Sequence, residues 1–271
     1  MGVLLEWLYG HAAGMTWQFD DLANLKELGG VSTREGLLQY LFGGVAGPGG
    51  RPLSLLAFLP NYADWDGNPW GFARGTLLLH GLNALLATLL FTQLWRSVAD
   101  DVDCRLQVRS PLVWGTLAAV LWAAQAIHAS GILMPVQRMT HVSGFFVLLT
   151  LWLYVMLRRN FAGAPGWWPL IALSGTVGVG TVLAVLGKEN GALTVSLVAV
   201  IESLWLCRLT PPAPRAVWRA WVWLAWLVVP VFLIGTYLLR GWAGLMASYR
   251  YYRPFSLMER LATEPVVKAE A

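Results

Sequence analysis

Six long runs of apolar residues constrain this chain more than any other feature of its sequence. They cover residues 75–95, 111–127, 142–157, 167–187, 191–207 and 218–239. A helix needs about 17–25 mostly apolar residues to cross the hydrocarbon core of a bilayer, so each run predicts a membrane-spanning helix. Only 13% of the residues are charged, whereas soluble domains have about 25%. This composition excludes a soluble globular enzyme, and we predict an all-α integral membrane protein.

Basic residues in the short connections predict which ends of these spans face the cytoplasm. The connections 96–110, 158–166 and 208–219 together hold Arg96, Arg105, Arg109, Arg158, Arg159, Arg208, Arg215 and Arg219. The opposite connections hold only Arg138 and Lys188. Because Lys and Arg are enriched in cytoplasmic loops, we place the first set in the cytoplasm and the second outside. The net charge of +4 is then a feature of membrane topology, and we expect no nucleic-acid partner.

We treat residues 1–271 as a single membrane domain. Residues 1–16 predict only part of a first span, because they are apolar but short and include Glu6. Residues 75–239 hold six spans, so the bundle has about six to seven transmembrane helices when the partial first span is counted, and an outer tail follows at 240–271. Since the chain begins and ends abruptly, we expect it to be a fragment of a longer protein.

Residues 17–74 are too long and too patterned for a plain outer loop. Leu22, Leu25 and Leu28 recur at helical spacing before Gly29 and Gly30, which predicts a short helix that ends at the glycines. Ser32 and Glu35 match a capping box ahead of a second apolar stretch. We therefore predict amphipathic helices that lie on the membrane surface.

Asp20 and Asp21 form an acidic pair near the predicted outer surface. A carboxylate that is partly desolvated there is suited to act as a general base on a hydroxyl group. The alternative is that both residues only stabilise the N-terminus of a helix.

Arg138 and Lys188 are the two cations of the predicted outer connections. A charge at the membrane edge is a candidate functional residue, and a cation there is suited to bind a lipid phosphate. The alternative for both is snorkelling to the interface, with Lys188 paired to the adjacent Glu189. Together with Asp20 and Asp21 they fall on one predicted face, which favours a common site.

Histidines add polar groups to the same region. His80 and Asn83 share a helix face at i, i+3 spacing, and an interhelical hydrogen bond is the alternative to a functional role. His128 and His141 flank the outer loop and are candidates for supporting roles. No His-x-x-x-His or Glu-x-x-His spacing is present, so local spacing indicates no zinc site. Glu202 is expected to snorkel at the cytoplasmic end.

Several ordered motifs resemble one family of membrane enzymes. They are Phe19-Asp20-Asp21 with Asn24-Leu25, Gly50-Arg51-Pro52-Leu53-Ser54, His80-Gly81-Leu82-Asn83, Ala126-Ile127-His128, Gln137-Arg138-Met139-Thr140 and Gly187-Lys188-Glu189-Asn190. Between about residues 17 and 265 the chain resembles polytopic GT-C glycosyltransferases. The resemblance is strongest to bacterial type IV pilin glycosyltransferases and to O-mannosyltransferase-like proteins associated with tetratricopeptide repeats. It departs from the family pattern at Ala129, where members usually have Pro after His128.

The resemblance implies a GT-C fold and an inverting transfer of a sugar from a polyprenyl-phosphate donor to a hydroxyl of a protein or glycan. The acceptor would be a pilin-like or other envelope protein, and the site would face the periplasm from the bacterial inner membrane. It implies that Asp20, or else Asp21, is the general base. Arg138 and Lys188, with Arg51 as a third cation, would stabilise the phosphate leaving group. No cofactor is required, although a divalent cation at Asp20 and Asp21 stays open.

Two other functions remain open on the sequence. A transporter or flippase of lipid-linked sugars would need polar residues at the middle of the bilayer and internal repeats. Mid-span polar residues are few and no internal repeat is evident in the sequence. A truncated, non-catalytic fragment would bind lipid or a partner without sugar transfer.

Overall fold

The computed structural model describes residues 15–43, 50–99, 110–164, 166–228 and 232. Within these residues the chain forms helices and turns and no strands. The predicted partial span at 1–16 and the outer tail at 240–271 lie almost wholly or wholly outside them. Residues 15–226 belong to one compact unit, which is the subject of the description that follows. In chain order, its helices are α2 (Phe19–Leu25), η2 (Lys26–Gly30), α3 (Arg34–Phe42), α4 (Pro52–Leu56), η3 (Leu59–Asp64), α5 (Pro69–Ala99), α6 (Pro111–Ala123), α7 (His128–Leu133), η4 (Pro135–Gln137), α8 (Arg138–Asn160), α9 (Trp167–Gly187), η5 (Glu189–Leu193), α10 (Thr194–Ile201), η6 (Glu202–Leu206) and α11 (Arg215–Trp223); η7 (Leu224–Val228) follows.

Four helical stretches are long and apolar enough to cross a membrane. They are Pro69–Ser97, Pro135–Asn160, Trp167–Gly187 and Glu189–Leu206. Exposed leucine, valine and tryptophan side chains lie on the outside of α5, α6, α9 and α10, which suits contact with lipid, whereas no large apolar side chain of Pro135–Asn160 is exposed. The structure is therefore consistent with an all-α membrane protein.

One of the predicted spans differs from the observed helix, and another lies partly outside the described residues. The run 111–127 forms α6, which ends at Ala123 after 13 residues. At 1.5 Å per residue such a helix is about 20 Å long, shorter than the roughly 30 Å of a bilayer core. The run 218–239 is described only in part, as most of α11 and the π-helix η7 that follows it. The short run 142–157 does borrow flanking residues, since α8 covers Arg138–Asn160.

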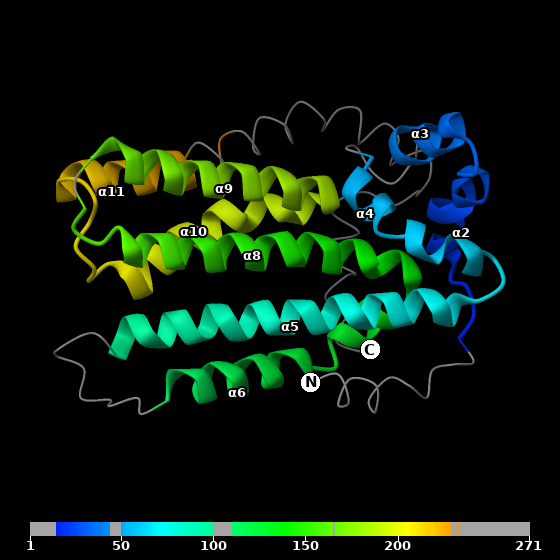
Figure 1. Cartoon of the computed structure of the whole chain (residues 1–271), viewed down its shortest axis with the longest axis horizontal. Coiled ribbons are helices and arrows are strands. Elements are labelled where there is room, and N and C mark those ends of the chain that lie inside the picture. Colours follow the sequence, from blue (N-terminus) through cyan, green and yellow to red (C-terminus); the bar gives the residue numbers. More distant parts are fainter. Residues whose placement is uncertain (1–14, 44–49, 100–109, 165, 229–231, 233–271) are drawn as a thin grey trace, which may run out of the picture. The chain divides into compact units, whose positions relative to one another are not determined.

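Helices α5, α6, α8 and α9 form the body of the unit (Figure 1), with α6 packed on α5, and α8 between α5 and α9. Small residues permit these close approaches. A Cβ atom at Gly180 would collide with the Thr150 side chain on α8, and one at Gly115 would collide with Thr92 on α5. Close backbone approach at small residues is the usual way in which membrane helices pack.

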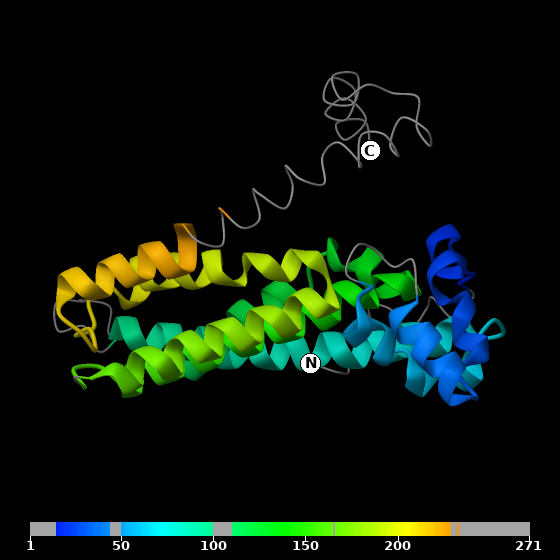
Figure 2. The ribbon, with the colours of Figure 1, turned by 90° about the horizontal axis from the view of Figure 1, so that it is seen from above.

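The described parts of the connections predicted to lie on opposite sides of the membrane lie at opposite ends of this bundle. Figure 2 shows α2, α3 and α4 gathered at one end and the start of α11 at the other. We call the end with α2–α4 the loop end and the end with the start of α11 the arginine end.

The 17–74 region forms short helices, as predicted, and they build a cap on the loop end. A buried apolar cluster joins them to the first turns of α5 and α8; its members are Leu25, Leu28, Tyr40, Leu55, Phe58, Phe72, Val136 and Met139. One local prediction is wrong: Thr33, and not Ser32, accepts the backbone N–H of Gly36 at 3.0 Å. The helix begins one residue later than the Ser32 capping box requires, at Arg34.

Candidate functional site

A pocket of about 300 Å³ lies at the loop end, among residues of α5, α6, α7, α8 and the junction of α9 with η5. Its walls are apolar apart from a set of histidine, asparagine, serine, threonine and lysine side chains. The lining residues are His80, Asn83, Trp122, His128, Thr140, His141, Ser143, Gly144, Val147, Leu148, Lys188 and Asn190. An apolar pocket with a few convergent polar groups is the usual form of a small-molecule site.

Lys188 directly follows the last residue of α9 and is the only Lys or Arg among the residues that line this pocket. Its ammonium group donates to Thr140 Oγ1 at 2.7 Å and to Gln137 Oε1 at 3.3 Å. Burial lowers the pKa of Lys188, the Arg51 charge lowers it further, and Glu189 opposes both effects. Within the described residues Lys188 forms no ion pair, so the predicted pairing with the adjacent Glu189 is not what the structure shows.

Arg51 is the partner of Glu189 instead. Its guanidinium reaches both carboxylate oxygens, with Nη2 at 2.9 Å from Oε2 and Nε at 3.1 Å from Oε1. The pair ties α4 to η5, two segments that are far apart in the sequence. Arg51 also has a left-handed backbone, with φ at 50°, a conformation uncommon in residues other than glycine. The resemblance expects Arg51 to stabilise the phosphate leaving group. In the structure, the Glu189 carboxylate offsets the positive charge of Arg51.

Arg138 is buried in the junction between α4, α5 and α8. Its guanidinium donates to Thr76 Oγ1 at 3.1 Å and to the carbonyl oxygens of Ala57 and Phe72. It also lies over the rings of Phe58 and Phe72, with its Cζ 4.8 Å and 5.5 Å from their centroids. Gly75 makes room for it, because a Cβ atom there would lie 2.6 Å from Nη2. The structure thus does not place Arg138 on the pocket lining, and it is not a snorkelling side chain.

The two adjacent aspartates have different surroundings. Asp21 is fully buried, and its carboxylate accepts backbone N–H groups from Val136 at 2.7 Å and from Gln18 at 2.8 Å. Burial raises the pKa of Asp21 from its usual 3.8, against the opposing effect of these two hydrogen bonds. Asp20 is exposed. Asp21 therefore fixes α2 on η4, and Asp20 is the aspartate that is open to other molecules.

Three histidines meet in the pocket. His80 comes from the middle of α5, His128 from the start of α7 and His141 from the second turn of α8. The His80 ring centroid lies 4.9 Å from that of His128 and 5.2 Å from that of His141. Burial lowers the pKa of His128. His80 Nε2 bonds to the carbonyl oxygen of Ala123 at 3.0 Å, and Asn83 donates to that of His141 at 3.0 Å, so the expected interhelical hydrogen bonds are present.

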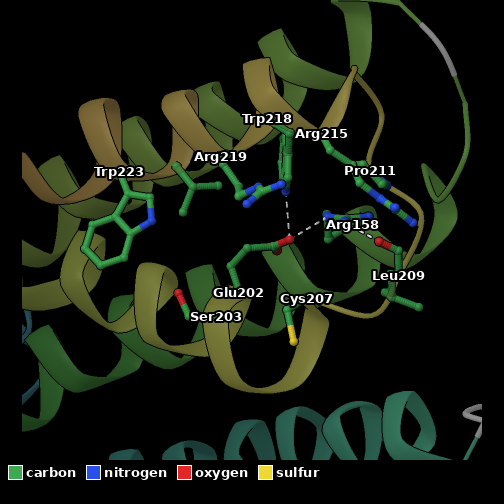
Figure 3. Close-up of a pocket in the computed structure, with 11 residues that line it drawn as sticks. Arg158, Glu202, Ser203, Cys207, Leu209, Pro211, Arg215, Trp218, Arg219 and Trp223 are labelled. Atoms are coloured by element: carbon green, nitrogen blue, oxygen red, sulfur yellow. Dashed lines mark hydrogen bonds and ion pairs between the residues drawn. The ribbon is translucent and has the colours of Figure 1, made fainter.

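A second cavity, of about 450 Å³, lies at the arginine end. Figure 3 shows its centre, where Arg158 of α8 and Glu202 of η6 meet beneath Trp218 of α11. The Arg158 Nε atom lies 3.1 Å from Glu202 Oε1, and both side chains are almost fully buried. The prediction that Glu202 snorkels is therefore wrong, because its carboxylate is held inside the bundle by partners that are remote in the sequence.

The sequence motifs named most residues of the loop end, but not their grouping. The structure brings His80, Asn83, His128, His141 and Lys188 together on one pocket, and leaves Arg51, Glu189, Arg138 and Asp21 in contacts that join the cap to the helices. Sequence reasoning did not single out the lining residues Trp122, Val147 and Leu148. It also missed the histidine cluster, because the three side chains come from different helices.

Comparison with known protein families, with curated protein sequences and with solved structures found no match to this chain.

Proposed function

We propose that this chain is a membrane glycosyltransferase of the GT-C kind, which transfers a sugar from a polyprenyl-phosphate donor to a hydroxyl group on the outer side of a bacterial inner membrane. The observation that carries the proposal is the pocket at the loop end with Lys188 on its wall. The ammonium group of Lys188 has only neutral acceptors, Thr140 and Gln137. An anion that enters this pocket therefore finds a cation that forms no ion pair with another described residue.

The same pocket is apolar over most of its lining, which suits the first isoprene units beside a lipid phosphate. Developing negative charge on a phosphate leaving group is stabilised by a fixed cation in a site with little water. We assign this role to Lys188. Arg138 and Arg51 then act indirectly, since they hold α4, α5, α8 and η5 around the pocket.

We assign the general base to Asp20, with Asp21 in a structural role. The Asp20 side chain is exposed, whereas both oxygens of Asp21 already accept backbone N–H groups. A base must be free to accept the proton of the acceptor hydroxyl. The acceptor, a pilin-like or other envelope protein or a glycan, would approach from the cap.

Donor binding is tested by native mass spectrometry of the purified chain with a polyprenyl phosphate. Lys188→Met should weaken binding about tenfold or more, because hydrogen bonds to charged groups contribute about 1.5–3 kcal/mol. Lys26→Met is the matched control, since Lys26 is exposed and paired only with its neighbour Glu27. Equal binding by wild type and Lys188→Met, or no binding by folded wild type, would overturn the proposed donor site.

Sugar transfer to a peptide acceptor tests the catalytic assignment. Asp20→Asn should abolish transfer and leave polyprenyl-phosphate binding unchanged. Asp21→Asn should retain transfer in the fraction that stays folded, because an amide oxygen can still accept one of the two backbone N–H groups. Full transfer by Asp20→Asn would contradict the role of Asp20.

A further inference from the structure

The histidine cluster of the loop end has the chemistry of a metal site. His80, His128 and His141 each offer a ring nitrogen, and these nitrogens all lie within 4.8 Å of one another. His80 and His141 are buried and His128 is partly buried. Because the three residues come from α5, α7 and α8, the fold and not a local motif creates the group.

Several nitrogens of the cluster have no hydrogen-bond partner. These are His80 Nδ1, His128 Nε2 and both ring nitrogens of His141. A buried polar atom without a partner costs about 1–3 kcal/mol, so native structures avoid it unless the atom has another use. Seven buried side-chain nitrogen and oxygen atoms in the described residues lack a partner, and five of them belong to His80, Asn83, His128 and His141. Their concentration in one pocket places several free lone pairs where a ligand could use them.

The hydrogen bond of His80 fixes which of its nitrogens is free. The Ala123 carbonyl oxygen can only accept, so Nε2 of His80 must carry the proton. Nδ1 then has a free lone pair. A backbone carbonyl that orients the remote nitrogen in this way is the usual support for a histidine that binds a metal.

The histidine at position 141 also has space made for it by a neighbour. A Cβ atom at Gly131 of α7 would lie 2.8 Å from the His141 Cε1 atom. Any larger residue at position 131 would push the imidazole out of its present place. The sequence of α7 thus accommodates this ring beside His128.

We propose that His80, His128 and His141 bind one divalent transition-metal ion of the Zn²⁺ class, with a fourth position open to the pocket. Neutral imidazoles are preferred ligands of Zn²⁺, and three protein ligands with one open position are typical of catalytic zinc. The Zn–N distance of about 2.0–2.1 Å requires the three rings to draw closer together. Lys188 and Asn190 line the same pocket, so the open position would take a water molecule or an anionic oxygen.

This inference does not rest on the proposed sugar transfer, because the ligands are defined without any donor. Metal binding is measured on the purified chain in detergent, with an affinity tag that contains no histidine and without added lipid. The chain is stripped with a chelator, equilibrated with Zn²⁺ or Co²⁺, and analysed by elemental mass spectrometry. One equivalent of metal is expected, and Co²⁺ should give the visible absorption of a tetrahedral nitrogen site.

Variants of each ligand test the assignment. His80→Gln, His128→Gln and His141→Gln should each weaken metal binding at least tenfold. His11→Gln is the matched control, because His11 is the fourth histidine of the chain and lies outside the described residues. Loss of binding in His11→Gln to the same extent, or retention of a full equivalent in the triple variant, would overturn the proposal.

A second readout is independent of metal analysis. A ligand that binds only the folded state raises the unfolding temperature, so Zn²⁺ should raise that of the wild type and leave that of His141→Leu unchanged. Leucine fills the space of the imidazole without a polar atom, which keeps the variant folded. An equal shift in both proteins would mean that Zn²⁺ binds elsewhere, and would overturn the site.

Discussion

The two ends of the helix bundle each bury charged or polar side chains, and they do so in opposite ways. At the arginine end every polar atom of the Glu202 carboxylate is used: Oε1 accepts from Arg158 and Trp218, and Oε2 accepts from Tyr154 at 2.8 Å. At the loop end five buried atoms of four side chains have no partner. Satisfied buried networks hold a structure together, whereas unsatisfied buried groups require an explanation, such as water, strain or a bound ion. The contrast supports a structural role for the arginine end and is compatible with the binding that we propose for the loop end.

Arg158 of the arginine end is satisfied as fully as its partner. Its Nη1 and Nη2 atoms donate to the carbonyl oxygens of Thr210 and Leu209 at 3.2 Å and 3.3 Å, and its Cζ lies 4.9 Å from the Trp218 ring centroid. These contacts join α8, η6 and α11 into one packed group (Figure 3). The polar groups beside the cavity of the arginine end therefore already have partners within the protein. Those of the pocket at the loop end do not.

The largest effect is expected when the ion pair of the arginine end is broken. Arg158→Leu leaves the buried Glu202 carboxylate without its cation, and losing one partner of a buried pair costs about 3–5 kcal/mol. Denaturant unfolding in detergent, followed by circular dichroism, measures it. The matched control is Lys26→Ala, because Lys26 and Glu27 form an exposed pair at 3.8 Å that should contribute about 0–1 kcal/mol. A similar loss of unfolding free energy in Arg158→Leu and Lys26→Ala would contradict the structural role of the arginine end.

The opposite sign is expected at the loop end of the metal-free protein. His141→Leu removes two buried nitrogens that have no partner, so it should stabilise the chelator-treated chain by about 1–2 kcal/mol. The unfolding free energy of both proteins in the presence of chelator gives the answer. If His141→Leu destabilises the metal-free chain as strongly as Arg158→Leu does, the imidazole is a structural group and the contrast between the two ends fails.

A smaller change tests the space that Gly131 leaves for His141. Gly131→Ala adds a Cβ atom 2.8 Å from the imidazole, which should displace the ring and weaken Zn²⁺ binding about tenfold, or about 1.4 kcal/mol. Gly178→Ala is the control, since a Cβ atom there meets nothing within 4 Å. A competition titration with a chromophoric chelator measures both affinities. Equal affinities in the two variants would show that the ring position is not critical.

Hydropathy predicted the helices well because lipid contact depends on single residues and not on their partners. The run 167–187 coincides with α9, and the run 191–207 coincides within two residues with the stretch Glu189–Leu206. The run 111–127 failed at its C-terminal end. There the chain leaves the helix after Ala123 and turns into α7, which begins with His128 of the pocket. The mean hydropathy of a run of residues cannot show such a turn.

The partners of the polar residues could not be predicted in the same way. Glu202 was expected to reach the interface, but Arg158, 44 positions away, pairs with it inside the bundle. Lys188 and Glu189 are adjacent in sequence, yet Glu189 binds Arg51, which is 138 positions away. Sequence patterns identify polar residues that need a partner, but the tertiary structure determines which residue that partner is. The same limit hid the three histidines, which have no diagnostic spacing.

The smallest effect is expected at Asp21. This buried carboxylate lies at the loop end but has hydrogen-bond partners, so it should behave as a structural group and not as part of the binding pocket. Burial raises its pKa above the usual 3.8 in the folded chain. Below pH 3.8 the carboxyl group is protonated in both states. As the pH rises above that value, the unfolded chain loses the proton first. The free energy of unfolding therefore decreases until the pH passes the folded-state pKa, and it is constant above that pH.

The unfolding temperature of the wild type should therefore contain a component that falls between about pH 4 and the raised pKa and then stays constant. Asp21→Asn should lack this component. It should also unfold at a lower temperature in the acid range, because an amide oxygen replaces only one of the two carboxyl oxygens that accept the N–H groups of Val136 and Gln18. Asp20→Asn, which changes the exposed neighbour, should keep most of the wild-type pH profile. Identical pH profiles of the unfolding temperature for wild type and Asp21→Asn would contradict the raised pKa of Asp21. They would also contradict its role in attaching α2 to η4.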